Sequence, residues 1–304
     1  MTTMQTTQYI WQNGKMLPWD EAKTHVLSHT LHYGGGAFEG IRFYKTANGP
    51  AIFCLAQHVE RLLYSCSVIK MELPYDAAAI AEAIIEVVRV NKLEEGYIRP
   101  LAYYGYGKMG VSPQGAPAEL AIACWPWGAY LPHDMIDVLV SKYIRIHPGS
   151  SVVDAKLCGH YVNGILASIE LRGTHYHEAL LLDADGNIAE GVGENFFMVK
   201  DGVIYTPMLG TILAGITRAT TMKLANDLGY KVVETTLKLD EAYAADEAFF
   251  TGTAAEVAPI RTINDKILGN GQLGPVTSKI KSGYFQIVHG ENPAYMDYLT
   301  VVNR

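Results

Sequence analysis

Residues 151–167 read SVVDAKLCGHYVNGILA, a run of small and apolar residues that contains one lysine, Lys156. An ammonium group is costly to bury unless it is paired or loses its charge. Three explanations are open for Lys156. It is a surface lysine whose stem lies along apolar neighbours, a salt-bridged core lysine, or a lysine whose amine does covalent chemistry.

The composition is that of a globular protein with a substantial core. With 304 residues, 49% of them hydrophobic, the chain is long enough for one large domain or two of ordinary size. Its net charge of −7 argues against nucleic acid as the main partner, because that needs a broad basic surface. The four cysteines show no CxxC pair and no metal spacing, so we expect reduced thiols and no bound metal. We expect no signal peptide and no membrane-spanning segment, and therefore a cytoplasmic protein.

The pattern of apolar residues predicts a mixed fold. In the first half, strands are expected within 8–19 and 41–54, with turns at Asn13-Gly14 and Asn48-Gly49-Pro50, and at 97–105 and 119–127. Helices are expected at 57–70 and 76–92. In the second half, strands are expected at 136–146, 179–183, 188–199, 203–206, 230–237 and 246–251, and helices at 216–228 and 276–288. Because strands and helices do not alternate regularly, this order predicts two α+β domains and not a doubly wound sheet.

One short motif points to a different class, the nucleotide-binding oxidoreductases. Residues 105–110 read GYGKMG, which matches the GxGxxG pattern of dinucleotide-binding folds. That pattern should open a helix, whereas the chain continues as VSPQGAPAE, in which prolines and a glycine prevent a regular helix. We therefore expect a loop at 105–110.

Several other segments carry groups that suit a phosphate-bearing cofactor. The turn into a helix at 212–220, where Thr217 is expected to cap the helix, and the Thr-Gly-Thr-Ala-Ala turn at 251–255 both offer backbone N–H groups to an anion. Arg61 can add charge-assisted hydrogen bonds. Glu190 can hold a pyridine nitrogen protonated, and a lysine in an apolar site can form a Schiff base. Each feature alone has an ordinary structural explanation, but together they match pyridoxal phosphate.

With these segments in view, the sequence resembles the fold-type IV pyridoxal-phosphate enzymes, and within them the family of branched-chain amino acid aminotransferases. The matching segments are HYGGGAFEGIRFY (32–44), YIRP (97–100), MGV (109–111), WPWGAYL (125–131), AKxxGxY (155–161), EGxGEN (190–195), GITR (215–218) and GTAAE (252–256). The resemblance implies a two-domain α+β fold. Its parts would be a smaller N-terminal α/β sandwich-like domain at 1–129, a linker at 130–136 and a larger C-terminal pseudo-barrel domain at 137–304.

The resemblance also implies pyridoxal 5′-phosphate as the cofactor and gives each cofactor-binding residue a role. Lys156 would be the Schiff-base lysine and proton shuttle, and Glu190 would pair with the pyridine nitrogen. Tyr161 would hydrogen-bond the phenolic oxygen of the cofactor. The residues implied to hold its phosphate are Arg61, Ile216, Thr217 and Thr253.

The implied activity is transamination of L-leucine, L-isoleucine and L-valine with 2-oxoglutarate by a ping-pong mechanism, as used in branched-chain amino acid biosynthesis. Arg99 lies two residues after Tyr97 on one strand, so both should point to the same face, and Arg99 would bind the distal carboxylate of glutamate. A loop carrying Met109 and Val111 would come from a neighbouring subunit, which implies at least a homodimer with shared active sites. The residues implied to line the substrate pocket are Tyr33, Phe38, Tyr97, Arg99, Met109, Val111, Tyr130, Thr253 and Ala254.

Other activities share part of this pattern. D-amino acid aminotransferase, (R)-amine transaminase and aminodeoxychorismate lyase use the same cofactor groups, but FEGIR, YIR and MGV in this order favour the branched-chain family. A Schiff-base aldolase without a cofactor would also use an apolar lysine, yet it would need neither Glu190 nor two phosphate-binding turns. After the lysine, Leu157, Cys158 and His160 replace the smaller or amide residues of many relatives.

Overall fold

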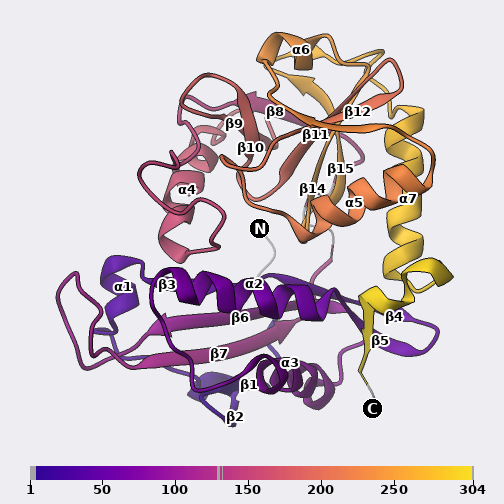
Figure 1. Ribbon diagram of the computed structural model, residues 1–304. Helices are drawn as coiled ribbons and strands as arrows, with labels where there is room; N and C mark the ends of the chain where they lie inside the picture. The colour runs from indigo at the N-terminus through magenta and orange to yellow at the C-terminus, as the bar shows by residue number, and fades with distance from the viewer. Residues whose placement is uncertain (1–4, 129–130, 132, 303–304) are drawn as a thin grey trace. The chain divides into compact units, whose positions relative to one another are not determined.

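The computed structural model describes residues 5–128, 131 and 133–302, which form two compact units (Figure 1). The first unit comprises Met1–Gly128, Ala155–Gly159 and Ile287–Arg304, and the second comprises Ala129–Asp154 and His160–Gln286. Two segments therefore group with the N-terminal part of the chain: the one that contains Lys156, and the C-terminal tail. The division into folding domains at 1–129, 130–136 and 137–304 stays a prediction.

The first unit is built on an eight-stranded antiparallel sheet. Its strands lie in the order β17-β5-β4-β6-β7-β1-β2, and β3 pairs with β6. They are β1 (Tyr9–Gln12), β2 (Lys15–Pro18), β3 (Gly36–Phe38), β4 (Ile41–Thr46), β5 (Gly49–Phe53), β6 (Gly96–Tyr104), β7 (Ala118–Trp125) and β17 (Leu299–Val301). The hairpin β1–β2 turns at Asn13-Gly14, where both residues have positive φ, as this dipeptide predicts.

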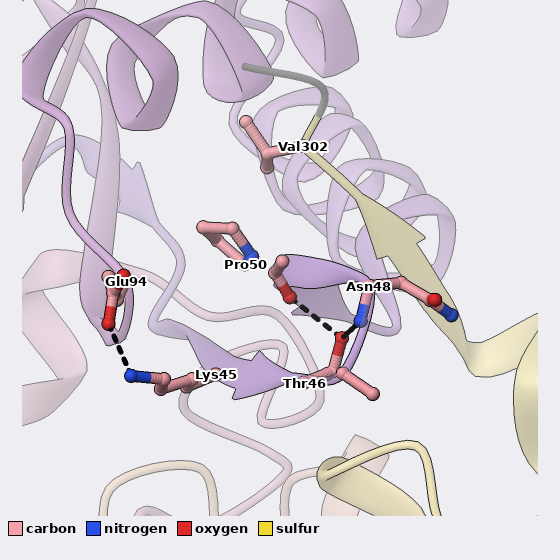
Figure 2. Close-up of a pocket in the computed structure, with 8 residues that line it drawn as sticks. Lys45, Thr46, Asn48, Pro50, Glu94 and Val302 are labelled. Atoms are coloured by element: carbon pink, nitrogen blue, oxygen red, sulfur yellow. Dashed lines mark hydrogen bonds and ion pairs between the residues drawn. The ribbon is translucent and has the colours of Figure 1, made fainter.

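The turn between β4 and β5 is held by a threonine side chain. Thr46 Oγ1 donates to Gly49 O over 2.7 Å and accepts from Asn48 N over 3.1 Å (Figure 2). A surface pocket of 560 Å³ lies beside this turn, with an exposed ion pair between Lys45 and Glu94 at its edge. The charged residues that line it, Lys45 and Glu94, are both exposed, and we assign no function to this pocket.

Two amphipathic helices, α2 (Leu55–Val68) and α3 (Ala77–Asn91), pack on one face of this sheet. Leu62 of α2, Ile84 of α3 and Ile98 of β6 are fully buried in one cluster, because each helix turns its apolar stripe to the sheet. The Asp76 side chain caps α3 by accepting from Ala79 N over 2.8 Å. Both helices confirm the predicted positions within two residues.

The second unit contains a nine-stranded sheet that closes on itself. Strands β10, β9, β8, β15, β14 and β11 follow one another, and β10 pairs again with β11 to complete a ring. The pair that closes the ring is Glu190 opposite Asn195. The strands are β8 (Ile136–Val140), β9 (Glu178–Leu182), β10 (Ile188–Gly191), β11 (Asn195–Lys200), β12 (Val203–Pro207), β13 (Val232–Thr235), β14 (Glu247–Gly252), β15 (Glu256–Ile263) and β16 (Lys266–Ile267). This barrel-like sheet confirms the expected α+β class.

The remaining helices are mostly in the second unit. They are α1 (His29–Tyr33), α4 (Tyr161–Glu170), α5 (Ile216–Asp227), α6 (Leu239–Tyr243) and α7 (Pro275–Val288), with 3₁₀ turns at Trp19–Glu21, Cys158–His160 and Pro293–Tyr298. The predictions of α5 and α7 are confirmed, whereas α4 was not predicted. It packs through small residues: a Cβ on Gly164 would lie 2.8 Å from Val192 Cγ1. No helix among the described residues is long and apolar enough to cross a membrane.

Two strand predictions are wrong in extent. The expected strand at 188–199 is two strands, because Gly191 N donates to Glu194 O over 2.7 Å and closes a tight turn at 192–194. The expected strand at 136–146 ends at Val140, after which the chain becomes irregular. Residues 105–110 form a loop, which confirms that GYGKMG opens no helix.

Candidate active site

Lys156 lies in a short segment that the first unit holds by its backbone. Lys156 N donates to Ser65 Oγ of α2 over 2.9 Å, and Lys156 O accepts from Phe38 N of β3 over 3.2 Å. The neighbours Ala155 and Leu157 are buried, whereas the lysine side chain is half-buried. Its Nζ lies 5.0 Å from the centroid of the Phe38 ring, within the range of a cation–π contact. The main chain is therefore fixed while the amine remains at the border of the core.

A second cation shares the Phe38 ring. The guanidinium carbon of Arg99 lies 4.8 Å from the centroid of Phe38, 5.5 Å from that of Tyr97 and 6.0 Å from that of Trp125. Tyr97 and Arg99 share the face of β6 opposite to α2 and α3, as their spacing predicts. Arg99 Nε is buried and has no hydrogen-bond partner among the described residues. A buried guanidinium N–H of this kind is suited to an anionic ligand.

The residue after Phe38 belongs to a buried ionic network. Glu39 is fully buried and accepts hydrogen bonds from His58 Nδ1 (2.7 Å), Arg61 Nε (2.7 Å) and Arg61 Nη2 (2.8 Å). Burial alone would raise the pKa of Glu39, but the charge and hydrogen bonds of Arg61 and the bond from His58 hold that pKa well below its usual range. Burial lowers the pKa of His58, and the charges of Arg61 and Lys156 add to this, so Glu39 only partly offsets the shift.

One face of α2 supports both groups. His58, Arg61 and Ser65 are spaced by three and four residues, so they lie along one side of the helix. Two of them hold Glu39 and the third holds the backbone of Lys156. Residue 40, which follows Glu39, has to be glycine, because a Cβ there would lie 1.9 Å from Tyr97 Oη.

In the second unit, the carboxylate of Glu190 accepts hydrogen bonds from a guanidinium, a side-chain amide and a backbone N–H. Its carboxylate accepts from Arg145 Nε over 2.5 Å, from Asn195 Nδ2 over 3.0 Å and from Leu213 N over 3.1 Å. The side chains of Glu190 and Arg145 are 8% and 11% exposed, so solvent screens this pair weakly. The result is a charged acceptor with a fixed orientation at the point where the barrel closes.

Asn195 connects this carboxylate to the start of α5. Its Nδ2 also donates to Leu213 O over 2.9 Å, and a Cβ on Gly215 would lie only 1.9 Å from Asn195 Oδ1. Helix α5 begins at Ile216 after Gly215, and no side chain caps it. The prediction that Thr217 caps the helix is wrong, because Thr217 is the second helical residue and is buried. The uncapped first turn leaves backbone N–H groups suited to an anion.

The other expected site residues lie as follows. Thr253 and Ala254 are half-buried in the turn between β14 and β15, and Tyr161 is half-buried at the start of α4. Tyr33, at the end of α1, and Met109 and Val111, in the loop after β6, are exposed by 42%, 44% and 81%. The expected substrate residue Tyr130 lies outside the described residues.

The unusual residues after the lysine have local partners. Leu157 pairs with Ala37 in an isolated β-bridge, and Cys158 Sγ lies where a Cβ on Gly36 would approach it to 3.0 Å. His160 Nε2 and Ser151 Oγ are hydrogen-bonded at 2.5 Å. Burial raises the pKa of the Cys158 thiol to about 11, so the thiol is protonated at neutral pH.

Sequence reasoning missed four charged or polar residues of these networks. Glu39 had a detectable signal, because it is the one acidic residue in the mostly apolar segment GAFEGIRF. His58 had none, because it lies among the polar residues of QHVERLL. Asn195 stood in the segment EGxGEN, close to its partner Glu190, but without an assigned role, whereas Arg145 had no signal because its partner lies 45 positions away.

The comparisons with known proteins agree with this organisation. The chain matches the family model described as amino-transferase class IV over residues 36–263, and it belongs to that family. It is 46% identical over 297 residues to the branched-chain-amino-acid aminotransferase of Pseudomonas aeruginosa, covering 96% of this chain and 97% of that protein. It is 41% identical over 308 residues to the enzyme of the same name from Escherichia coli K12, covering 99% and 100%.

Solved structures show the same likeness. A branched-chain amino acid aminotransferase from T.th., complexed with N-(5′-phosphopyridoxyl)-L-glutamate, superposes with a TM-score of 0.96 at 46% identity, covering 98% of this chain and 100% of that one. The Escherichia coli branched-chain amino acid aminotransferase gives a TM-score of 0.95 at 41% identity, with the same coverage. These likenesses confirm the family and fold expected from the sequence.

Proposed function

We propose that this protein is a pyridoxal-phosphate-dependent aminotransferase that moves the amino group of L-leucine, L-isoleucine or L-valine to 2-oxoglutarate. The observation that carries the proposal is the likeness over nearly the whole chain to enzymes named for this activity. One of these was solved with a phosphopyridoxyl group joined to L-glutamate. The likeness favours this activity over those of the D-amino acid and (R)-amine transaminases.

The chemistry of the residues present fits the cofactor. When bound, pyridoxal phosphate supplies a carbonyl carbon that reacts with amines and a ring that withdraws electrons from the substrate Cα. Lys156 provides the amine, on a backbone fixed by Ser65 and Phe38. Glu190 provides a carboxylate for the pyridine nitrogen, oriented by Arg145 and Asn195.

The phosphate is proposed to bind where backbone amides and a guanidinium are offered. The uncapped start of α5 supplies the N–H groups of Ile216 and Thr217, and the turn after β14 supplies Thr253. Arg61 adds a guanidinium whose plane is set by its pair with Glu39. Tyr161 is the proposed donor to the phenolic oxygen of the cofactor.

Two different substrates have to use one pocket. Arg99 is proposed to bind the distal carboxylate of glutamate, and the rings of Phe38 and Tyr97 that flank it offer apolar surface to a branched side chain. The amine of Lys156, once released from the cofactor, removes the proton from the substrate Cα and later returns one. Ala254 and Tyr130 complete the proposed substrate pocket.

We further propose at least a homodimer with shared active sites. The exposed Met109 and Val111 are apolar residues on a loop, and α4 carries a second exposed apolar stripe at helical spacing. The residues of this stripe are Val162, Ile165, Leu166 and Ile169. Contiguous exposed apolar surface of this kind is typical of an interface. Sedimentation of the purified protein tests the dimer, and cell fractionation tests the expected cytoplasmic location.

Reduction with borohydride tests the cofactor and the lysine together. The purified protein should be yellow, and borohydride should bleach it and add the mass of the reduced cofactor to the peptide that contains Lys156. The variant Lys156→Ala should take up no such label. A colourless protein that stays inactive with added pyridoxal phosphate, or a label on a different lysine, would contradict the proposal.

A further inference from the structure

We propose that Glu39, supported by His58, is a positioning residue that fixes the guanidinium of Arg61 for the phosphate group of the cofactor. This inference rests on the proposed function. It adds to it that the anion-binding arginine depends on a buried carboxylate that does not itself touch the cofactor.

The geometry is that of a two-point clamp. Glu39 Oε1 accepts from Arg61 Nε over 2.7 Å, and Glu39 Oε2 accepts from Arg61 Nη2 over 2.8 Å. Two parallel bonds fix the plane of a guanidinium, which a single bond does not. Arg61 is 12% exposed and Glu39 is fully buried, so water does not compete for the carboxylate.

Charge alone does not explain a carboxylate at this place. A negative charge within hydrogen-bond distance of an anion-binding arginine repels the anion and lowers its affinity. Glu39 therefore opposes phosphate binding through its charge, and the benefit that it brings is the orientation of Arg61. These two effects have opposite signs, which makes them separable by experiment.

His58 supports the carboxylate of Glu39. Its Nδ1 lies 2.7 Å from Glu39 Oε2, and its side chain is 1% exposed. As a neutral donor it fixes the carboxylate without adding a second positive charge to the network. Because His58, Arg61 and Ser65 lie on one face of α2, the same rigid element also holds the backbone of Lys156.

A matched control exists in the second unit. Asp137 is 2% exposed and holds Arg261 by its Nε, over 2.8 Å, and by its Nη2, so it forms a two-point pair of the same kind with a buried carboxylate, although the Arg261 side chain is 52% exposed and that of Arg61 is 12% exposed. The variants Glu39→Gln and Asp137→Asn each remove one buried charge from such a pair. A general loss of stability should appear in both, whereas a loss of phosphate affinity should appear only in Glu39→Gln.

The experiment measures dissociation constants of the apoprotein for pyridoxal phosphate and for pyridoxal, which lacks the phosphate. We expect Glu39→Gln to weaken pyridoxal phosphate binding about tenfold or more, the change that corresponds to ~1.4 kcal/mol. Its affinity for pyridoxal should stay at the wild-type value, and Asp137→Asn should leave both affinities unchanged. Wild-type or tighter binding of pyridoxal phosphate by Glu39→Gln, or an equal loss for pyridoxal, would overturn the proposal.

A second pair of variants decides the question if Glu39→Gln does not fold. His58→Asn keeps a donor near the Nδ1 position and should retain pyridoxal phosphate affinity, whereas His58→Leu removes it and should weaken binding severalfold. Equal affinities of these two variants would overturn the role of His58. If the wild-type apoprotein binds neither cofactor form, the proposed function itself fails, and that result differs from every outcome for the variants.

Discussion

Replacing Arg145 by leucine should destabilise the second unit strongly. The change removes the guanidinium that pairs with Glu190 and leaves that carboxylate buried beside the neutral donors Asn195 Nδ2 and Leu213 N. Breaking a buried ion pair on one side costs about 3–5 kcal/mol, because the remaining charge stays desolvated. Since both side chains are about nine-tenths buried, we expect a loss of ~3 kcal/mol in the free energy of unfolding.

Urea unfolding of the apoprotein at neutral pH measures this loss. Lys223→Ala is the matched control, because Lys223 pairs with Asp227 on the surface of α5, where both side chains are nearly half exposed. An exposed pair of this spacing contributes only about 0.3–0.5 kcal/mol. If Arg145→Leu lost no more stability than Lys223→Ala, the reasoning that Arg145 compensates a buried charge at Glu190 would be refuted.

Three further predictions follow from the same contacts. Gly215→Ala should lower the free energy of unfolding by about 1–3 kcal/mol, because the added methyl would lie 1.9 Å from Asn195 Oδ1, and the loss should appear as a lower Tm. The control Gly193→Ala should lose less stability, because a Cβ there meets no atom within 4 Å. Arg99→Leu should raise the KM for 2-oxoglutarate about tenfold or more but leave conversion of L-leucine nearly unchanged, because 2-oxoglutarate has a distal carboxylate and L-leucine has none. Equal losses for both substrates would contradict the role of Arg99 in binding that carboxylate. Burial raises the pKa of Cys66 and Cys124 to about 12. The contribution of these two thiols to the free energy of unfolding should therefore be constant below about pH 9 and fall by ~1.4 kcal/mol per pH unit and thiol between about pH 9 and 12. A Cys124→Ala variant with the same alkaline slope as the wild type would contradict that assignment.

Much of the fold follows from local pattern in the sequence. The hairpin at Asn13-Gly14 and the helices α2 and α3 were predictable because turn residues and apolar spacing act over a few residues. Helix α4 escaped prediction because Gly164, which favours no helix, is required for contact with Val192. The break at 192–194 was hidden because apolar residues continue on both sides of the turn.

Some residues of the candidate site could also be found from the sequence, whereas others could not. The residues themselves drew attention to Lys156, Glu190 and Arg61, and the family resemblance gave them the roles that stay proposals. The partners that orient them depend on contacts between distant residues: Arg145 lies 45 positions before Glu190, and Glu39 lies 22 positions before Arg61. No local pattern records such pairs, because they arise when strands and helices pack, and only the structure reveals them.

The most direct test of the central claim is a half-reaction in the absence of 2-oxoglutarate. Purified holoprotein mixed with L-leucine should release one 4-methyl-2-oxopentanoate per subunit and lose its yellow colour, and 2-oxoglutarate added afterwards should restore the colour and yield L-glutamate. Lys156→Ala should do neither, because it lacks the amine that moves the proton. Holoprotein that reacts with D-alanine or (R)-1-phenylethylamine but not with L-leucine would contradict the account.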